Sequence, residues 1–183
     1  MLRHSRWMIA AAAVWAIQAI PAHAQFLKDR DRAPAPEFSG VTRWIGTEPL
    51  SMKKLRGKVA VIHFWTHGCY NCVNNYPHYK AWNDRYAGKD VVFIGIHTPE
   101  TEGERDIERI EAQLKKNGLK FKVAVDNDFK NWQAWKNRYW PTVYVVDRKG
   151  VVRYGWEGEL NYMGQKGEET VRKVIDALLE EPR

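Results

Sequence analysis

The sequence predicts one α/β domain built on a mixed β-sheet. Short apolar segments alternate with amphipathic helical segments, the pattern of a sheet with helices packed against it. Near the C-terminus two strand patterns flank a four-residue turn, and this hairpin makes the sheet mixed rather than wholly parallel. The chain has 183 residues, 44% hydrophobic and 13% aromatic, which is enough for one well-buried domain but not for two.

The apolar segments predict six strands. The clearest is 58–65, where Val59-Ala60-Val61-Ile62 begins an almost continuous apolar run, as expected for a central strand buried on both faces. A short strand is expected before it at 41–45, and two more are expected after it at 91–96 and 121–125. The hairpin consists of 142–146 and 151–156, joined by Asp147-Arg148-Lys149-Gly150.

Four helices are expected, at 69–86, 101–116, 128–138 and 168–179. The segment 101–116 has the best-marked ends, because acidic residues occupy its first turn and Asn117-Gly118 follows its last residue. Ile107, Ile110 and Leu114 share one face of this helix. That apolar face predicts that the helix packs on the sheet.

The first 24 residues have the pattern of a secretory signal peptide. Arg3 and Arg6 precede an apolar run of 13 residues, and Pro21-Ala22-His23-Ala24 ends in an Ala-x-Ala cleavage pattern. The run is short for a membrane span, which needs roughly 20 residues, although an uncleaved anchor is the alternative. Cleavage leaves 25–40 as a flexible lead-in and 41–183 as the domain. We therefore expect an exported protein, periplasmic in a Gram-negative bacterium.

Composition excludes several classes of function. The formal net charge is +7, but the basic residues are dispersed among acidic ones and form no stripe for nucleic acid. The sequence has neither a Gly-rich phosphate loop nor a Gly-x-Ser-x-Gly elbow. Its two cysteines exclude a scaffold held by several disulfides. The functional hypotheses therefore centre on Cys69 and Cys72.

These two cysteines lie where the central strand ends and a helix begins. Unpaired N–H groups and partial positive charge at a helix N-terminus favour a thiolate, so Cys69 is expected to be the nucleophile. Cys72, one turn further into the helix, can then resolve a mixed disulfide. A structural disulfide and a metal site are the alternatives. Zinc needs four ligands, and a contribution from His67 or His78 would give at most an irregular site.

Several segments together resemble a known family. The run Phe64-Trp65-Thr66-His67-Gly68-Cys69-Tyr70-Asn71-Cys72 resembles the active-site segment of exported TlpA/ResA-type proteins of the thioredoxin-like superfamily. Pro77 matches the proline of that family's active-site helix, and Trp140-Pro141-Thr142 matches the segment that carries its cis proline. With His97-Thr98-Pro99-Glu100, the likeness is nearest to the thioredoxin domain of DipZ-type proteins. It covers roughly residues 40–180.

The resemblance implies a thioredoxin fold and thiol-disulfide exchange through Cys69 and Cys72, with no cofactor and no metal. It places Pro141 beside the disulfide, and Trp140 would shape the substrate surface. Substrates would be disulfides or dithiols of other exported proteins, and a membrane thiol-disulfide protein would supply electrons. Tyr70-Asn71 provides no cation or His between the cysteines, so we expect a reductase. The alternatives are a copper- or zinc-handling protein and a binding adaptor with the same fold.

Three further side chains are candidates for tuning the cysteine pair. His63 stands six residues before Cys69, where thioredoxin has a buried Asp. It either relays a proton to Cys72 or is a core histidine facing the other side of the sheet. His67 either stabilises the thiolate as a cation or is a solvated loop residue. Glu100 lies where some TlpA-like proteins place an acid near the active site, but helix-capping charge explains it equally well.

Overall fold

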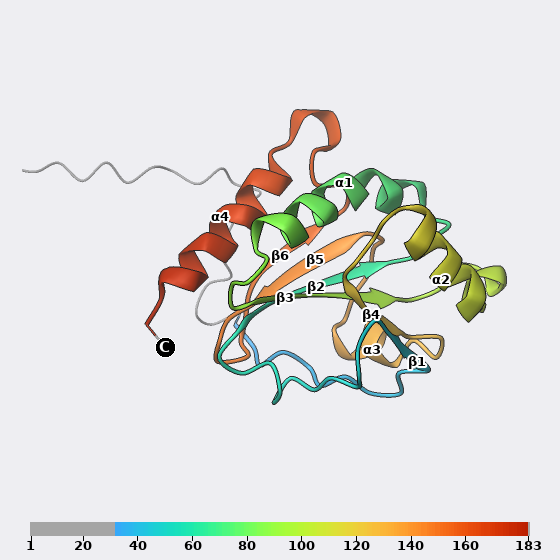
Figure 1. Cartoon of the computed structure of the whole chain (residues 1–183), viewed down its shortest axis with the longest axis horizontal. Helices are drawn as coiled ribbons and strands as arrows, with labels where there is room; N and C mark the ends of the chain where they lie inside the picture. Colours follow the sequence, from blue (N-terminus) through green and yellow to red (C-terminus); the bar gives the residue numbers. More distant parts are fainter. Residues whose placement is uncertain (1–31, 183) are drawn as a thin grey trace, which may run out of the picture.

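The structure is a computed structural model and describes residues 32–182. Its centre is a six-stranded sheet in the order β1-β4-β3-β2-β5-β6 (Figure 1). The central strand β2 (Val59–Trp65) is parallel to β3 (Val91–His97) and antiparallel to β5 (Thr142–Val146). The strand β4 (Lys122–Val125) is parallel to β3, whereas β1 (Arg43–Ile45) and β6 (Val152–Glu157) are antiparallel edges. The predicted mixed sheet and C-terminal hairpin are confirmed.

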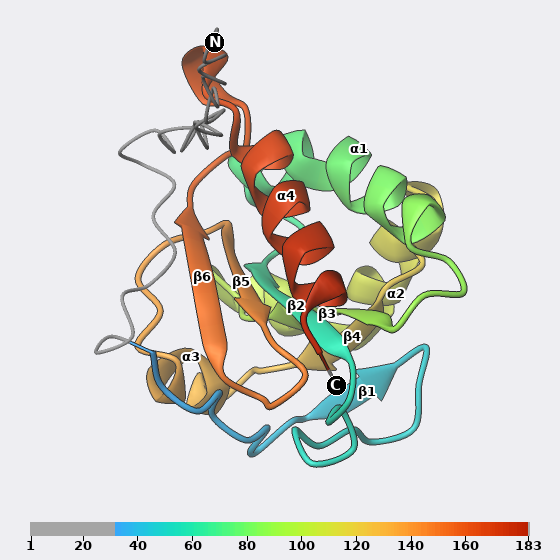
Figure 2. The same ribbon diagram turned by 90° about the vertical axis from the view of Figure 1, so that its left-hand side faces the viewer.

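Helices cover both faces of the sheet. The helices α1 (Tyr70–Arg85), α2 (Ile107–Lys116) and α4 (Gly167–Glu180) pack on one face, and the short α3 (Lys130–Ala134) packs on the other (Figure 2). Every residue of β2 is buried, as the apolar run predicts. Alternate side chains of β2 enter two separate cores, one under α1, α2 and α4 and the other beside α3.

Two of the expected helices are shorter than predicted. The segment 101–116 is divided into a 3-10 turn, Glu102–Arg105, and α2. The division occurs because the Asp106 carboxylate accepts hydrogen bonds from the backbone N–H groups of Glu108 and Arg109, which begins a new helix there. The expected helix 128–138 is reduced to α3, which ends before Lys136, a residue with φ of 51°.

The lead-in prediction needs a correction where the structure describes it. The backbone N–H of Ala35 donates to the Gly150 carbonyl, and the N–H of Val152 donates to the Ala33 carbonyl, both at 2.9 Å. Pro34 lies between these bonds, where an edge position requires no N–H donor. Residues 33–35 therefore extend the sheet edge instead of forming a flexible segment. The signal-peptide prediction at 1–24 and the part of the lead-in before residue 32 lie outside the described residues.

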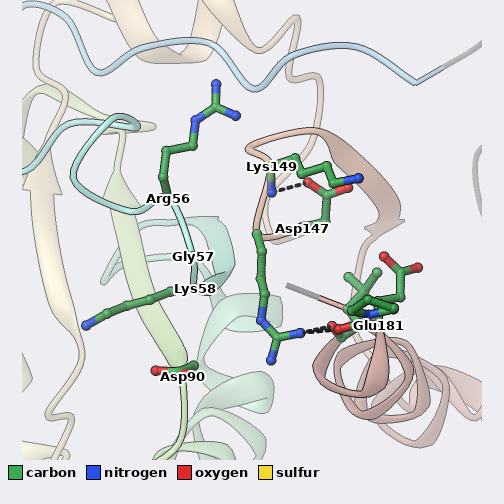
Figure 3. A pocket seen from close by; sticks show the side chains of 10 residues that line it. Arg56, Gly57, Lys58, Asp90, Asp147, Lys149 and Glu181 are labelled. Carbon is green, nitrogen blue, oxygen red and sulfur yellow. Dashed lines mark hydrogen bonds between the residues drawn. The ribbon is translucent and has the colours of Figure 1, made fainter.

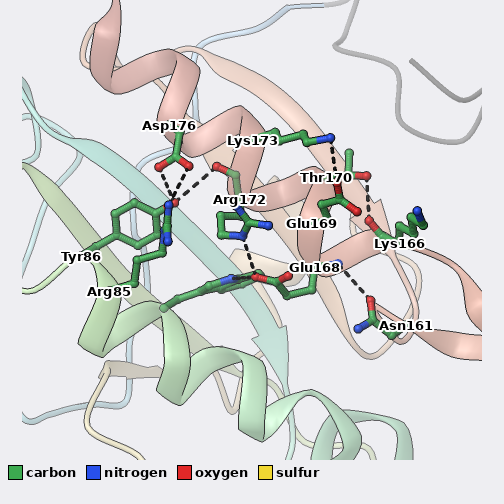
Figure 4. Close-up of polar contacts among 11 residues, drawn as sticks. Arg85, Tyr86, Asn161, Lys166, Glu168, Glu169, Thr170, Arg172, Lys173 and Asp176 are labelled. Carbon is green, nitrogen blue, oxygen red and sulfur yellow. Dashed lines mark hydrogen bonds and ion pairs between the residues drawn. The ribbon is translucent and has the colours of Figure 1, made fainter. Parts of the chain in front are cut away.

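Polar contacts attach α4 to α1, the helix that begins at the cysteine pair (Figure 4). The Tyr86 hydroxyl donates to the Asp176 carboxylate at 2.8 Å, and Arg85 pairs with the same carboxylate at 3.3 Å. One turn earlier the indole N–H of Trp82 donates to Glu168 at 3.0 Å. None of the helices within 32–182 has the length and hydropathy that a membrane crossing requires.

A cavity of about 420 Å³ lies at the sheet edge opposite the cysteine pair, where Gly57 and Lys58 enter β2 (Figure 3). Part of its charged lining forms hydrogen bonds that hold the fold together. Arg148 donates to the carbonyl oxygens of Leu179 and Glu181 at the end of α4, at 2.9 and 2.8 Å. Asp147 accepts from the Lys149 backbone N–H at 2.9 Å. This cavity thus marks the attachment of α4 to the hairpin.

Candidate active site

Three segments of the chain meet at one edge of the sheet. The strands β2 and β3 are parallel, so their C-terminal ends carry Cys69 and His97-Thr98-Pro99-Glu100 to the same edge. The strand β5 runs the opposite way, and its first residue, which follows Pro141, therefore lies at that edge too. The topology thus gathers residues that are up to 72 positions apart, Cys69 and Pro141.

Cys69 is positioned as the reactive thiol. It is the N-cap of α1, it is half-buried, and it is not bonded to Cys72. A hydrogen bond from the Cys72 thiol, with further ones from the backbone N–H groups of Cys72 and Asn71, lowers the pKa of Cys69 to about 7. Burial and the Glu100 carboxylate oppose that change. A substantial fraction of Cys69 is therefore thiolate at neutral pH.

Cys72 has the opposite environment. Its side chain is fully buried on the face of α1 that packs against the sheet, and burial raises the pKa of its thiol well above the usual range. The hydrogen bond to Cys69 and the neighbouring negative charge act in the same direction. Cys72 thus stays protonated as a donor to Cys69, which is the division of roles that the sequence predicts for an attacking and a resolving cysteine.

The Trp140–Pro141 peptide bond is cis, the isomer that the family resemblance implies. The Trp140 ring stacks on Trp132 with 4.0 Å between ring centroids, and its indole N–H donates to the Thr98 carbonyl at 3.0 Å. The Pro141 carbonyl accepts a hydrogen bond from the Gly158 N–H at 2.7 Å. These contacts hold both residues in place at the active-site edge.

The buried Asp126 carboxylate connects α3 to this arrangement through hydrogen bonds. Asp126 accepts hydrogen bonds from the backbone N–H groups of Asn131 and Trp132, at 3.0 and 2.9 Å, and so caps α3. It also accepts from the Thr98 hydroxyl at 3.1 Å. Because Thr98 in turn binds the Trp140 indole, Asp126 links the cap of α3 to the substrate side of the site. The sequence gives no signal for this link, since its partners come from three separate segments.

His63 lies on the same face of the sheet as Cys72, which corrects the hypothesis that its ring faces the other side. Its ring packs on Tyr79 and Phe121, with centroid distances of 4.2 and 4.4 Å. Neither ring nitrogen has a hydrogen-bond partner among the described residues, and burial lowers the pKa of His63 to about 3. The ring is therefore neutral at physiological pH.

His67, in the loop before Cys69, is partly buried, and burial disfavours the cationic form that a thiolate-stabilising role would require. Its ring stacks on that of His97, and its Nδ1 lies 3.1 Å from Nε2 of His97 in a shared hydrogen bond. The same Nε2 atom lies 3.3 Å from the Thr66 hydroxyl. Burial lowers the pKa of His67, and it lowers that of His97 to about 3. The two rings thus pack together next to the cysteine pair, where burial disfavours a positive charge on either ring.

Two glutamates of the segment after β3 reach the site in different ways. Glu100 is exposed and near enough to the cysteines to raise the pKa of both thiols. Glu104 is buried and accepts from the backbone N–H groups of Glu100 and Thr101, at 2.6 and 3.1 Å. It also lies where a Cβ on Gly68 would be. The capping-box pattern Thr101-x-x-Glu104 is the sequence signal that identifies this residue.

Comparison with known proteins identifies relatives over most of the chain. The model of the AhpC/TSA family matches residues 32–155. Protein DipZ of Mycobacterium bovis is 37% identical over 131 residues, 70% of this chain and 19% of DipZ, so the chain spans about a fifth of that relative. Thiol-disulfide oxidoreductase YkuV of Bacillus subtilis is 28% identical over 123 residues, which are 67% of this chain and 82% of YkuV.

Solved structures show the same fold. The solution structure of a thioredoxin-like protein in the oxidized form gives a TM-score of 0.71 at 27% identity. The match covers 83% of this chain and 98% of that protein. The predicted thioredoxin fold and the predicted likeness to TlpA/ResA- and DipZ-type proteins are confirmed.

Proposed function

The chain belongs to the AhpC/TSA family, in its thioredoxin-like thiol-disulfide oxidoreductase branch, and we propose that it reduces disulfides of exported proteins through Cys69 and Cys72. The observation that carries this proposal is the contrast between the two thiols. Cys69 is partly exposed with a lowered pKa, and Cys72 is buried with a raised one. Such a pair combines an available nucleophile with a thiol held back for the second step.

The reaction proceeds in two exchanges. The Cys69 thiolate attacks one sulfur of a substrate disulfide, forms a mixed disulfide with it and displaces the other sulfur as a thiolate. Cys72 then attacks the Cys69 sulfur, and its proton passes to the substrate sulfur that is still bonded to Cys69. This releases the second substrate thiol and leaves a Cys69–Cys72 disulfide. Two electrons have passed to the substrate, and a dithiol of a membrane protein returns the chain to its reduced form.

Cis Pro141 and Trp140 position the substrate backbone in this proposal. Pro141 has no N–H, and its carbonyl is occupied by Gly158, so the Trp140 backbone on its other side is left to face the substrate. The stack on Trp132 fixes the position of the Trp140 ring beside this backbone.

Export is the second part of the proposal. The signal-peptide pattern of residues 1–24 supports it, and the product would begin at Gln25 and act in the periplasm of a Gram-negative bacterium. The intact mass of the protein from the periplasmic fraction tests this. A mass corresponding to residues 25–183 supports export with cleavage, and a full-length chain confined to the membrane fraction contradicts it.

The test of the chemistry is trapping of the intermediate. Cys72→Ser is expected to accumulate a mixed disulfide between Cys69 and a disulfide substrate such as insulin, visible as a reducible adduct. The wild-type chain is expected to turn insulin over in the presence of a dithiol, and Cys69→Ser is expected to do neither. An adduct that forms in Cys69→Ser but not in Cys72→Ser contradicts the assigned roles.

Metal handling stays an alternative that the same reagents examine. Within residues 32–182 no three His, Cys, Asp or Glu side chains gather closely enough to hold a metal ion. If Cu⁺ or Zn²⁺ protects both thiols from alkylation at a stoichiometry of one ion per chain while insulin is not reduced, the metal-handling function replaces the one proposed here.

A further inference from the structure

A groove of about 310 Å³ opens beside the cysteine pair, between the start of α1 and the loop that joins β6 to α4. Asn71, which lies between the two cysteines, forms one side of the groove. It is lined by Asn71, Glu157, Gly158, Glu159, Tyr162 and Gln165. Glu157 also lines a second cavity of about 330 Å³ over Thr142 and Tyr144, so the two cavities adjoin at this residue beside the outer strands β5 and β6.

Hydrogen bonds within the protein hold the wall of this groove that faces Asn71. Its base is tied to cis Pro141 through the Gly158 N–H, and Leu160 donates to the Asn75 side chain at 2.9 Å. Asn75 is one turn beyond Cys72, so this bond ties the loop directly to α1. The loop closes with a hydrogen bond from the Gly167 N–H to the Leu160 carbonyl, at 2.6 Å. A wall that is already ordered reduces the entropy lost when a partner binds.

The same loop presents apolar surface to solvent. Tyr162 is 56% exposed and Met163 is 85% exposed. Both belong to the loop between β6 and α4, which rises beside α1 in Figure 1. Large exposed apolar side chains on a rigid wall next to a nucleophile are typical of a surface that contacts a partner.

The groove is acidic although the chain as a whole is basic. Neither Glu157 nor Glu159 forms an ion pair with any of the described residues, and the lining contains no Lys or Arg. Glu100 adds a further carboxylate near the two thiols. Carboxylates without cationic partners attract a cationic ligand and repel an anionic one.

We propose that this groove binds the polypeptide substrate beside its disulfide and selects extended segments with Lys or Arg next to the cysteine. The cationic side chains face Glu157 and Glu159, and apolar residues further along contact Tyr162 and Met163. The inference rests on the proposed function and adds the class of substrate to it.

The test uses three peptides of one length, in which a single cysteine is flanked by Lys, by Ala or by Glu and carries a 2-pyridyl disulfide. The reduced full chain is mixed with each peptide, and release of pyridinethione gives the rate constant. We expect the order Lys, Ala, Glu, with about a tenfold span at low salt that shrinks to about twofold at high salt. Dipyridyl disulfide, which is neutral and small, reports the exchange chemistry alone.

Glu157→Gln/Glu159→Gln is expected to remove the preference for Lys while its rate with dipyridyl disulfide stays unchanged. Glu48→Gln/Glu111→Gln changes the net charge equally at two exposed positions away from the groove, and the preference should survive in it. Equal rates for the three wild-type peptides overturn the proposal, as does a preference that persists in Glu157→Gln/Glu159→Gln. No reaction with dipyridyl disulfide instead overturns the proposed function itself.

Discussion

Removal of the Cys72 thiol is expected to raise the pKa of Cys69. The hydrogen bond from Cys72 is the largest cause that lowers the pKa of Cys69 from 9.0 to about 7. A hydrogen bond to a charged group contributes about 1.5–3 kcal/mol, which corresponds to roughly one to two pH units. In Cys72→Ala the helix N–H groups remain, so the pKa of Cys69 should rise to between about 8 and 9.

The pH dependence of iodoacetamide alkylation measures this change, because only the thiolate reacts. For Cys72→Ser, which keeps a hydroxyl donor at the same position, the rate should reach half of its plateau near pH 7. For Cys72→Ala the midpoint should move upward. A Cys72→Ala midpoint that stays near 7 would show that the helix terminus alone sets the pKa of Cys69 and that the Cys72 thiol does not contribute.

Three further predictions concern the surroundings of the site. The pKa values of the buried His63 and His97 lie near 3 instead of 6.5, so the unfolded chain binds more protons between these values. Stability is therefore fully present above pH 6.5 and decreases as the pH falls, by up to ~2.7 kcal/mol per pH unit from these two histidines together. His63→Phe should lower the slope measured by urea unfolding between pH 6.5 and 5 by up to about 1.4 kcal/mol per pH unit, and an unchanged slope contradicts the assignment. Trp140→Ala removes a stacked ring and an indole hydrogen bond and should lower the free energy of unfolding by about 2–4 kcal/mol, whereas a loss below about 0.5 kcal/mol would show that the stack adds nothing. Gly68→Ala places a methyl group against the Glu104 carboxylate and should lower the free energy of unfolding by about 1–3 kcal/mol. The double variant with Glu104→Ala should recover part of this loss, and strictly additive losses would exclude the clash.

Much of the fold is predictable because its signals are local. The apolar run at Val59–Trp65 is long and uninterrupted enough to identify the central strand and the edge at which it ends. The role of Cys69 follows from the same logic, since any side chain at the start of α1 meets unpaired N–H groups. The cis bond before Pro141 is predicted only by the family resemblance, because no local pattern of residues distinguishes it from a trans bond.

The parts that the sequence did not predict depend on contacts between distant segments. His67 looks like a loop residue until β3 places His97 beside it, 30 positions later. Residues 33–35 look like a linker because the hairpin edge that they join is more than a hundred positions away. The groove of Glu157 and Glu159 has no local pattern, because its other side is Asn71.

The proposed chemistry requires that Cys69 and Cys72 form a reversible redox pair. Equilibration of the protein in graded thiol buffers, with alkylation of free thiols and counting by mass, tests it most directly. We expect a two-electron transition at a potential below about −220 mV, and this transition should be lost in Cys72→Ser. Two thiols that stay reduced across the whole buffer series, or that oxidise only between chains, would contradict it.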